Sequence, residues 1–227
     1  MSKTYVVSDL HLGHPCFQRK LFEEFLSHLP EQFTLVLNGD TIDSPGQELP
    51  AEDKALLLKL ASLSEEDGKD IIILSGNHDE SIELPENGNI EIAEFWVLAE
   101  SGTLITHGAS FDNVMPYNRW FLQLFKALHR LRIWLGCKPV HVAEYAKKWK
   151  PLYNYLRRTV RNNAIEHALE NGWTTVICGH LHCPEIYQSQ EVCYINTGSW
   201  TESSPYFACL KPDEAPLLIA YRGGSVA

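Results

Sequence analysis

The chain has 227 residues, a formal net charge of −10 and an ordinary globular composition, with 44% hydrophobic and 21% charged residues. These values exclude a collagen, a coiled coil and a wholly disordered chain, and the length corresponds to one or two domains. No apolar run approaches the roughly 18 residues of a membrane-spanning helix, and no basic-then-apolar leader precedes Tyr5, so a cytoplasmic protein is expected. Six scattered cysteines predict free thiols.

Short β-branched runs alternate with amphipathic stretches in the first part of the chain. Near-continuous apolar runs are typical of strands buried on both faces. The predicted strands are Thr4–Val7, Thr34–Leu37, Ile71–Leu74, Thr103–Thr106 and Thr175–Cys178. Leucines at helical spacing predict helices over Phe17–Leu29 and Ala51–Leu63. The alternation of strand and helix indicates an α/β fold with a largely central sheet.

After Pro184 the pattern changes to short strands separated by Gly, Ser and Pro, which predicts hairpins. These strands are Glu185–Gln188, Val192–Asn196, Tyr206–Leu210 and Leu217–Tyr221. No internal repeat or low-complexity tract divides the chain, so residues 1–227 are expected to form a single domain.

Within that domain, residues 111–171 are expected to form a helical insertion. Gly136 and Pro139 divide it into two long helices, and Pro151 is a candidate for a further break. Between Phe111 and Glu170 stand eleven Lys or Arg residues and four Asp or Glu residues, so a basic segment interrupts an acidic chain. Such a segment indicates either an anionic partner or a solvated helix face, and its charge leaves both open.

Polar side chains directly follow five of the predicted strands. They lie in the fragments 8–11, 38–43, 75–80, 107–108 and 179–182. Ligands bind outside the carboxyl ends of strands in open α/β sheets, so these fragments are expected to converge. Their carboxylates, imidazoles and one amide suffice for two divalent ions. Their glycines suit a backbone that leaves a strand sharply and close to an ion.

The ordered fragments resemble the signature of the calcineurin-like metallophosphoesterases. That signature is Asp-x-His, Gly-Asp-x-x-Asp, Gly-Asn-His-Asp or Glu, a later His and Gly-His-x-His, and the resemblance extends from Asp9 to His182. It implies a double β-sheet sandwich flanked by helices, with residues 111–171 as a helical lid. It also implies a hydrolase of phosphoester or phosphoanhydride bonds, with two metals bridged by an Asp and a hydroxide.

The resemblance assigns seven residues to the two metals. One metal would be bound by Asp9, His11, Asp40 and His182, and the other by Asp40, Asn77, His107 and His180. Asp40 would bridge them. Manganese is favoured over iron, zinc and cobalt because the ligands are mostly hard or borderline and because the family commonly uses it.

Further residues are expected around the reacting group. The resemblance makes His78 the group that donates a proton to the leaving oxygen or steadies the transition state. Asp79, assigned to the catalytic set, and Asp43 are predicted to orient ligand imidazoles through their second nitrogen, although Asp43 fits equally well as a turn residue. His14 lies in the first loop, either touching substrate or serving as a plain loop residue.

A narrower resemblance concerns the substrate. The segments Thr106–Asp112, Val176–Ile186 and Tyr194–Glu202 are similar to the UDP-2,3-diacylglucosamine pyrophosphatase branch of lipid A synthesis. In that branch the insertion is a lid that holds acyl chains, which implies an acylated nucleotide sugar as substrate. The best-known members carry Arg at the position of His78, so this chain departs from the branch there but not from the wider family.

The insertion itself is unusually apolar, with eleven apolar residues among the sixteen from Trp120 to Leu135. One core-facing stripe needs fewer. Arg119 and its basic neighbours would meet phosphates while Trp120 and the apolar face meet acyl chains or a membrane surface. Alternatively, both helices bury these side chains against the sheet and each other. Arg119, Trp120 and His14 are therefore the predicted substrate-binding residues.

Two other functions stay open. The first is a phosphodiesterase or phosphatase acting on a soluble nucleotide, a nucleic-acid end or a phosphoprotein. The second is a non-catalytic scaffold protein of the same fold, which predicts missing ligands, whereas all seven are present. General nucleic-acid binding is not expected, because the acidic remainder of the chain repels a polyanion.

Overall fold

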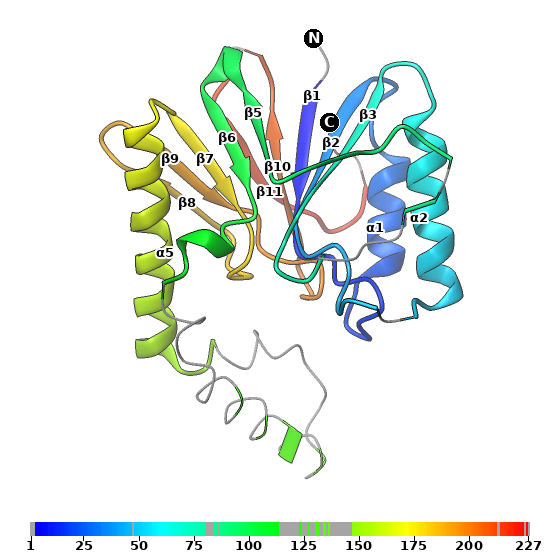
Figure 1. The fold of residues 1–227 in the computed structure, drawn as a ribbon, viewed down its shortest axis with the longest axis horizontal. Coiled ribbons are helices and arrows are strands. Elements are labelled where there is room, and N and C mark those ends of the chain that lie inside the picture. The colour runs from blue at the N-terminus through cyan, green and yellow to red at the C-terminus, as the bar shows by residue number, and fades with distance from the viewer. Residues whose placement is uncertain are drawn as a thin grey trace.

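The computed structural model describes residues 3–46, 48–79, 84–85, 87–113, 147–212 and 214–224, with the isolated positions 123, 127, 130–131, 134, 136 and 226. Two β-sheets lie face to face, and helices cover both outer faces (Figure 1). The predicted double sandwich flanked by helices is confirmed. The strands divide between two sheets, so the expectation of one largely central sheet is wrong.

The first sheet has the order β11-β10-β1-β2-β3-β4. Four of its strands run parallel, and they are β1 (Lys3–Val7), β2 (Phe33–Asn38), β3 (Lys69–Leu74) and β4 (Glu91–Ala93). β10 (Tyr206–Leu210) and β11 (Leu217–Ala220) add an antiparallel hairpin beside β1. The helices α1 (Arg19–Ser27) and α2 (Ala51–Ser64) cover its outer face.

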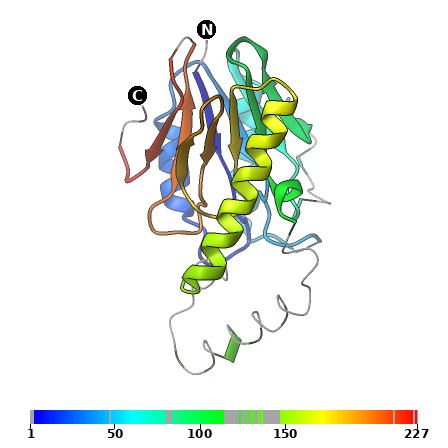
Figure 2. The same cartoon turned by 90° about the vertical axis from the view of Figure 1, so that its left-hand side faces the viewer.

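The second sheet has the order β5-β6-β7-β9-β8. β6 (Thr103–Thr106), β7 (Thr175–Cys178) and β9 (Cys193–Asn196) are parallel, while β5 (Phe95–Leu98) and β8 (Glu185–Gln188) are antiparallel to their neighbours. The long helix α5 (Lys150–Glu170) covers its outer face, as Figure 2 shows. Two short 3₁₀ turns, η1 (Ala99–Ser101) and η2 (Ala109–Phe111), flank β6.

The apolar strands are buried on both faces, as their sequences predict. In β1, Val6 points into the layer between the sheets, whereas Tyr5 and Val7 pack in the cluster that contains the helix side chains. Successive side chains of a strand point to opposite faces, so a strand between two apolar layers needs apolar residues throughout. Ile105 and Ile177 of the second sheet join Val6 in the inter-sheet layer.

Two features differ from the predicted elements. β4 was not predicted because it is a largely exposed edge strand of three residues without an apolar run, whereas β5 is a mostly half-buried edge strand whose four-residue apolar run, Phe95–Leu98, the prediction missed. Pro151 does not interrupt a helix but stands in the first turn of α5, where the missing N–H of proline has no intrahelical partner to lose. Among the described helices, none combines the length and apolar content that crossing a membrane requires.

Candidate metal centre

The loops that follow β1, β2, β3, β6 and β7 meet at one edge of the sandwich, the lower edge in Figure 1. Backbone hydrogen bonds join them, since Asp9 N–H donates to Gly39 O at 3.0 Å and His11 N–H donates to Asp40 O at 3.0 Å. The same edge receives the chain after β9, where Trp200 N–H donates to Asp9 O at 3.1 Å. Residues far apart in the sequence therefore converge as predicted.

Five of the predicted ligands adopt a left-handed backbone conformation, with φ between 51° and 67°. Within the described residues they are all the non-glycine positions that do so, and they are Asp9, His11, Asp40, His180 and His182. Each such conformation costs about 1–3 kcal/mol and persists only where the surrounding structure imposes it, commonly at a functional site. Here the strain is concentrated on the candidate ligands themselves.

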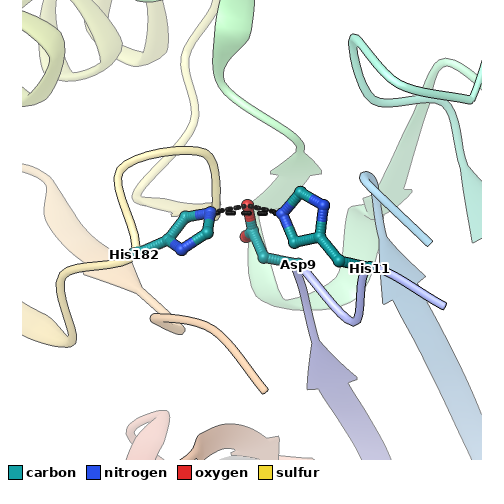
Figure 3. Close-up of side chains that lie close together, drawn as sticks. All are labelled: Asp9, His11 and His182. Carbon is teal, nitrogen blue, oxygen red and sulfur yellow. Dashed lines mark hydrogen bonds and ion pairs between the residues drawn. The ribbon is translucent and has the colours of Figure 1, made fainter. Parts of the chain in front are cut away.

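The first group of candidate ligands is Asp9, His11 and His182, drawn in Figure 3. The Nε2 atoms of the two imidazoles lie 3.3 Å apart, and Asp9 Oδ1 lies 3.1 Å from His182 Nε2 and 4.0 Å from His11 Nε2. All three residues are buried. Asp9 Oδ1 meets no donor in hydrogen-bond geometry among the described residues, whereas Asp9 Oδ2 accepts the His180 N–H at 3.0 Å.

The second group lies beside the first. His107 Nε2 faces Asp40 Oδ2 at 3.3 Å and Asn77 Oδ1 at 3.2 Å, and His180 Nδ1 faces Asn77 Oδ1 at 3.2 Å. Asp9, Asp40 and His107 also place one ligand atom each within 4.8 Å of one another. Asp9 therefore belongs to both groups by position.

The outward nitrogens of three imidazoles face oxygen acceptors. His107 Nδ1 lies 3.0 Å from Asn38 O, His180 Nε2 lies 3.1 Å from Asp112 Oδ2, and His11 Nδ1 lies 3.5 Å from Asp43 Oδ1. A ring N–H pointing outward leaves the inward nitrogen of a neutral imidazole with a lone pair. The inward nitrogens and the oxygens of Asp40, Asn77 and Asp9 then form a cluster of lone pairs, which suits a cation.

The spacing of these atoms agrees with shared coordination. Metal–nitrogen and metal–oxygen bonds of about 2.1 Å at roughly right angles place neighbouring ligand atoms about 3 Å apart. The contacts within both groups measure 3.1–3.3 Å, close to that value. The one longer contact is the 4.0 Å between Asp9 Oδ1 and His11 Nε2. The residues present therefore fit divalent metal ions.

The charges of the site support the same conclusion. Burial opposes ionisation of Asp9 and Asp40, but the neighbouring His182 and His107 outweigh it and lower the pKa of both carboxyls. Burial also opposes protonation of His107, yet Asp40 and Asp9 raise its pKa to about 9. Two ionised carboxylates thus share a buried site with a protonated His107, and a bound cation would displace that proton and take over its charge, which leaves the imidazole neutral with an inward lone pair.

Three glycines are required by close contact with the candidate ligands. A Cβ on Gly39 would lie 2.4 Å from His107 Nδ1, one on Gly76 would lie 2.3 Å from Asp40 Oδ1, and one on Gly179 would lie 2.5 Å from Asp9 Oδ2. Of the three, only Gly39 has a positive φ. The other two are needed for space and not for an unusual torsion, which the sequence alone does not distinguish.

Replacing Gly76 by Ala is expected to destabilise the fold by about 1–3 kcal/mol and to weaken metal binding, because the new Cβ displaces Asp40. Gly172→Ala is the control, since Gly172 has φ +74° but a Cβ there would meet no atom within 4 Å. It should cost stability through strain alone. Urea unfolding and manganese titration of both variants measure the difference, and an unchanged metal affinity in Gly76→Ala would contradict it.

His78 and Asp43 lie beside the two groups. His78 N–H donates to Asp40 Oδ1 at 3.0 Å, and His78 Nδ1 lies 2.5 Å from Asp43 O. Because a carbonyl only accepts, Nδ1 carries the proton and Nε2 remains free to face the site, 3.9 Å from Asp40 Oδ2. Asp43 Oδ1 lies 3.5 Å from His11 Nδ1. Of the two roles considered for Asp43, orienting an imidazole and forming a turn, this contact agrees with the first.

Asp79 contacts backbone instead of an imidazole. Its buried carboxylate accepts N–H groups from Thr41 at 3.2 Å, Ile42 at 3.1 Å and Gly76 at 3.0 Å. These bonds tie the loop after β2 to the loop after β3. Asp79 was predicted to orient imidazoles, but its described contacts are to backbone N–H groups. Asp79 therefore supports the loops that carry Asp40 and Asn77.

The predicted substrate-binding residues are only partly described. Arg119 and Trp120 lie outside the described residues. His14 lies in the loop after β1, where its Nδ1 accepts the Cys16 N–H at 3.0 Å, and burial lowers its pKa. Sequence reasoning missed Asp112, which contacts His180, and Lys147, which contacts the backbone of His182. Neither contact has a spacing signal, because each joins residues more than thirty positions apart.

Comparisons with known proteins agree with this fold. The chain is similar to Vacuolar Protein Sorting 29 from Cryptosporidium parvum, with 12% identity, coverage of 96% of each chain and a TM-score of 0.51. It is also similar to a novel archaeal phosphodiesterase, with 16% identity, coverage of 96% of this chain and 99% of that chain, and a TM-score of 0.50. At such identities the similarity concerns the fold alone.

No curated protein matches the chain. A family model described as calcineurin-like phosphoesterase matches residues 2–184, which include every candidate ligand. The chain therefore belongs to the calcineurin-like phosphoesterase family and is a hydrolase of phosphoesters.

Proposed function

We propose that the chain cleaves a phosphoester or phosphoanhydride with two divalent ions. Asp9, His11, Asp40 and His182 would hold one ion, and Asp40, Asn77, His107 and His180 the other, with Asp40 shared. The observation that carries the proposal is the cluster of inward lone pairs on seven residues, of which five are buried and five have a positive φ. Manganese is the proposed metal, because the ligand set is hard or borderline. Bound there, the ions would supply Lewis acidity and acidify the attacking water.

The protein's own groups account for the remaining chemistry. Asp112, Asn38 and Asp43 hold the imidazoles in the orientation that turns a lone pair inward. The side chain of His78 is 36% exposed and its Nε2 lies 3.9 Å from Asp40 Oδ2, which supports a contact with a substrate oxygen. We assign to His78 the protonation of the leaving oxygen, which requires the imidazolium form, with one proton on Nδ1 and the transferred proton on Nε2.

For the substrate, we propose an acylated nucleotide sugar of the UDP-2,3-diacylglucosamine type. Besides the similarity of three segments to that branch, large apolar side chains are exposed within residues 111–171. Trp134 is 80% exposed and Tyr155 is 59% exposed, with Leu131 and Trp149 also exposed. Such residues suit acyl chains, or a peripheral membrane contact. A soluble nucleotide phosphodiester is the second candidate.

The deciding experiment is a manganese-supplemented assay of three substrates: UDP-2,3-diacylglucosamine, its deacylated form and a simple aryl phosphodiester. The acyl proposal expects kcat/KM for the acylated compound to exceed that for the deacylated one by at least about tenfold, since each buried CH₂ contributes about 0.8 kcal/mol. Equal values would favour the soluble nucleotide. A protein that binds two ions yet hydrolyses none of the three would instead point to the scaffold alternative.

A further inference from the structure

The chain contacts the same three residues of the candidate centre before and after the segment 113–146. These residues are His180, Leu181 and His182, which follow β7 and include two candidate ligands with positive φ. Asp112 contacts them from just after η2, Lys147 from the turn before α5, and Tyr153 from the first turn of α5. We call Asp112, Lys147 and Tyr153 the brace.

Asp112 holds the imidazole of His180. Its side chain is buried, at 1% exposure, and Oδ2 lies 3.1 Å from His180 Nε2, while the opposite ring nitrogen faces Asn77 Oδ1. The turn that carries Asp112 is itself fixed, because Asn163 of α5 donates to Phe111 O at 2.8 Å and Phe111 is buried in the core under α5. The carboxylate therefore reaches the imidazole from a rigid support.

Lys147 and Tyr153 hold the backbone of the same loop. Lys147 Nζ donates to His182 O at 2.5 Å and is ion-paired with Glu202, and Tyr153 OH donates to Leu181 O at 3.1 Å. Carbonyl groups in a strained turn need such partners, because no regular ladder satisfies them. Without the Lys147 ammonium group, the short turn alone would fix the positions of the candidate ligands His180 and His182.

The neighbouring basic residues are used in a similar way. Arg157 and Arg161 are ion-paired with Glu185, the first residue of β8 and three residues after His182. The Arg161 guanidinium also lies over the ring of Tyr187, 3.8 Å from its centroid. Part of the basic character of the insertion is thus neutralised within the chain. An anionic partner is not needed to explain these residues.

From these contacts, we propose that the brace positions the two ligands of the Gly-His-x-His turn, with Asp112 and Lys147 acting on different metal sites. The inference rests on the proposed two-metal centre. Asp112 sets the His180 ring so that Nδ1 keeps its lone pair for the ion shared with Asn77 and His107. Lys147 fixes the peptide that carries His182, a ligand of the other ion.

Each site should then respond to its own residue. Partners of metal-bound histidines typically contribute 10–100-fold to metal affinity. Asp112→Asn is expected to weaken the ion held by His180 by about that factor, since an amide can donate to Nε2 and favour the wrong tautomer. Lys147→Met is expected to weaken the ion held by His182, by about tenfold or more.

The test is calorimetric titration of the full, metal-stripped chain with manganese. His107→Ala and His11→Ala identify which binding step belongs to which site. Lys148→Met is the matched control, because Lys148 is exposed and adjacent to Lys147, and it should bind as the wild type does. Thermal unfolding checks that each variant folds; should Asp112→Asn not fold, the partly exposed Lys147 keeps the inference testable.

The outcomes separate failure of the brace from failure of the proposed function. A wild-type chain that binds no metal would overturn the proposed function. A wild-type chain that binds two ions, with unchanged affinities in folded Asp112→Asn and Lys147→Met, would overturn the brace alone. Weakening of both ions equally by either variant would also count against it, because a general loosening of the fold predicts no site preference.

Discussion

Asp40→Asn is expected to lower the rate of phosphoester hydrolysis by at least about 1000-fold and to reduce the number of bound ions. Metal ions contribute several kcal/mol to stabilising the transition state, and each 1.36 kcal/mol is a factor of ten in rate. The substitution removes a buried negative charge that faces His107 at 3.3 Å. It keeps the size of the side chain and an oxygen able to accept the His78 N–H, so the loop after β3 keeps its support.

The measurement combines turnover of an aryl phosphodiester with metal content determined by mass spectrometry. Asp67→Asn is the control, because Asp67 is an exposed carboxylate and the charge change is identical. Wild-type turnover and full metal content in Asp40→Asn would contradict the assignment of Asp40 to the centre. A lower metal content with wild-type turnover would show that the second ion is not needed for the reaction.

The strand interiors were predictable because a strand that is buried on both faces has a near-continuous apolar run in its sequence. β6 and β7 were predicted with the same bounds that the structure has, and β1 and β2 differ from prediction by only one or two residues. Their partners were not predictable from periodicity, since β1–β3 and β6–β7 have the same apolar pattern. The pattern predicts that a strand is buried, but not which sheet buries it, so the sandwich followed only from the family resemblance.

The candidate centre was predictable where chemistry and position coincide in one short fragment. Asp9 and His11 directly follow a predicted strand, and so do His180 and His182. Asp112 has no such signal, because its partner lies 68 residues away and its side chain type is common in turns. The prediction of backbone strain was incomplete. Unusual torsions were expected at the glycines, but five of the candidate ligands also have a positive φ.

The basic segment illustrates a further limit of charge patterns. Counting charges indicated an anionic partner or a solvated face, but Lys147, Arg157 and Arg161 instead meet Glu202 and Glu185 across the fold. These glutamates are distant in sequence, so no local pattern pairs them with the lysine and arginines. Ion pairs of this kind fix the positions of the segments that they join. They contribute little to the free energy of unfolding where they are exposed.

His78→Ala is expected to reduce kcat about 100- to 10,000-fold for an ester with a poor leaving group while leaving both ions bound. General acid catalysis contributes this much when a proton must reach the leaving oxygen. The side chain of His78 is partly exposed, with Nε2 3.9 Å from Asp40 Oδ2 and its ring edge-on to that of His11, and His78 is not a candidate ligand, so its loss removes none. His28→Ala is the control, because His28 is an exposed histidine at the end of α1.

The dependence on leaving group decides between the two roles that the resemblance assigns to His78. A p-nitrophenolate leaves without protonation, so a general acid predicts a small effect of His78→Ala on the p-nitrophenyl ester and a large effect on the alkyl ester. A group that steadies charge on the phosphoryl oxygens predicts the same loss with both esters, because that charge develops whatever the leaving group is. The bond between His78 Nδ1 and Asp43 O favours the first result, since it holds Nε2 toward the site as the atom that gains and gives the proton. Wild-type rates with both esters would remove His78 from the reaction altogether.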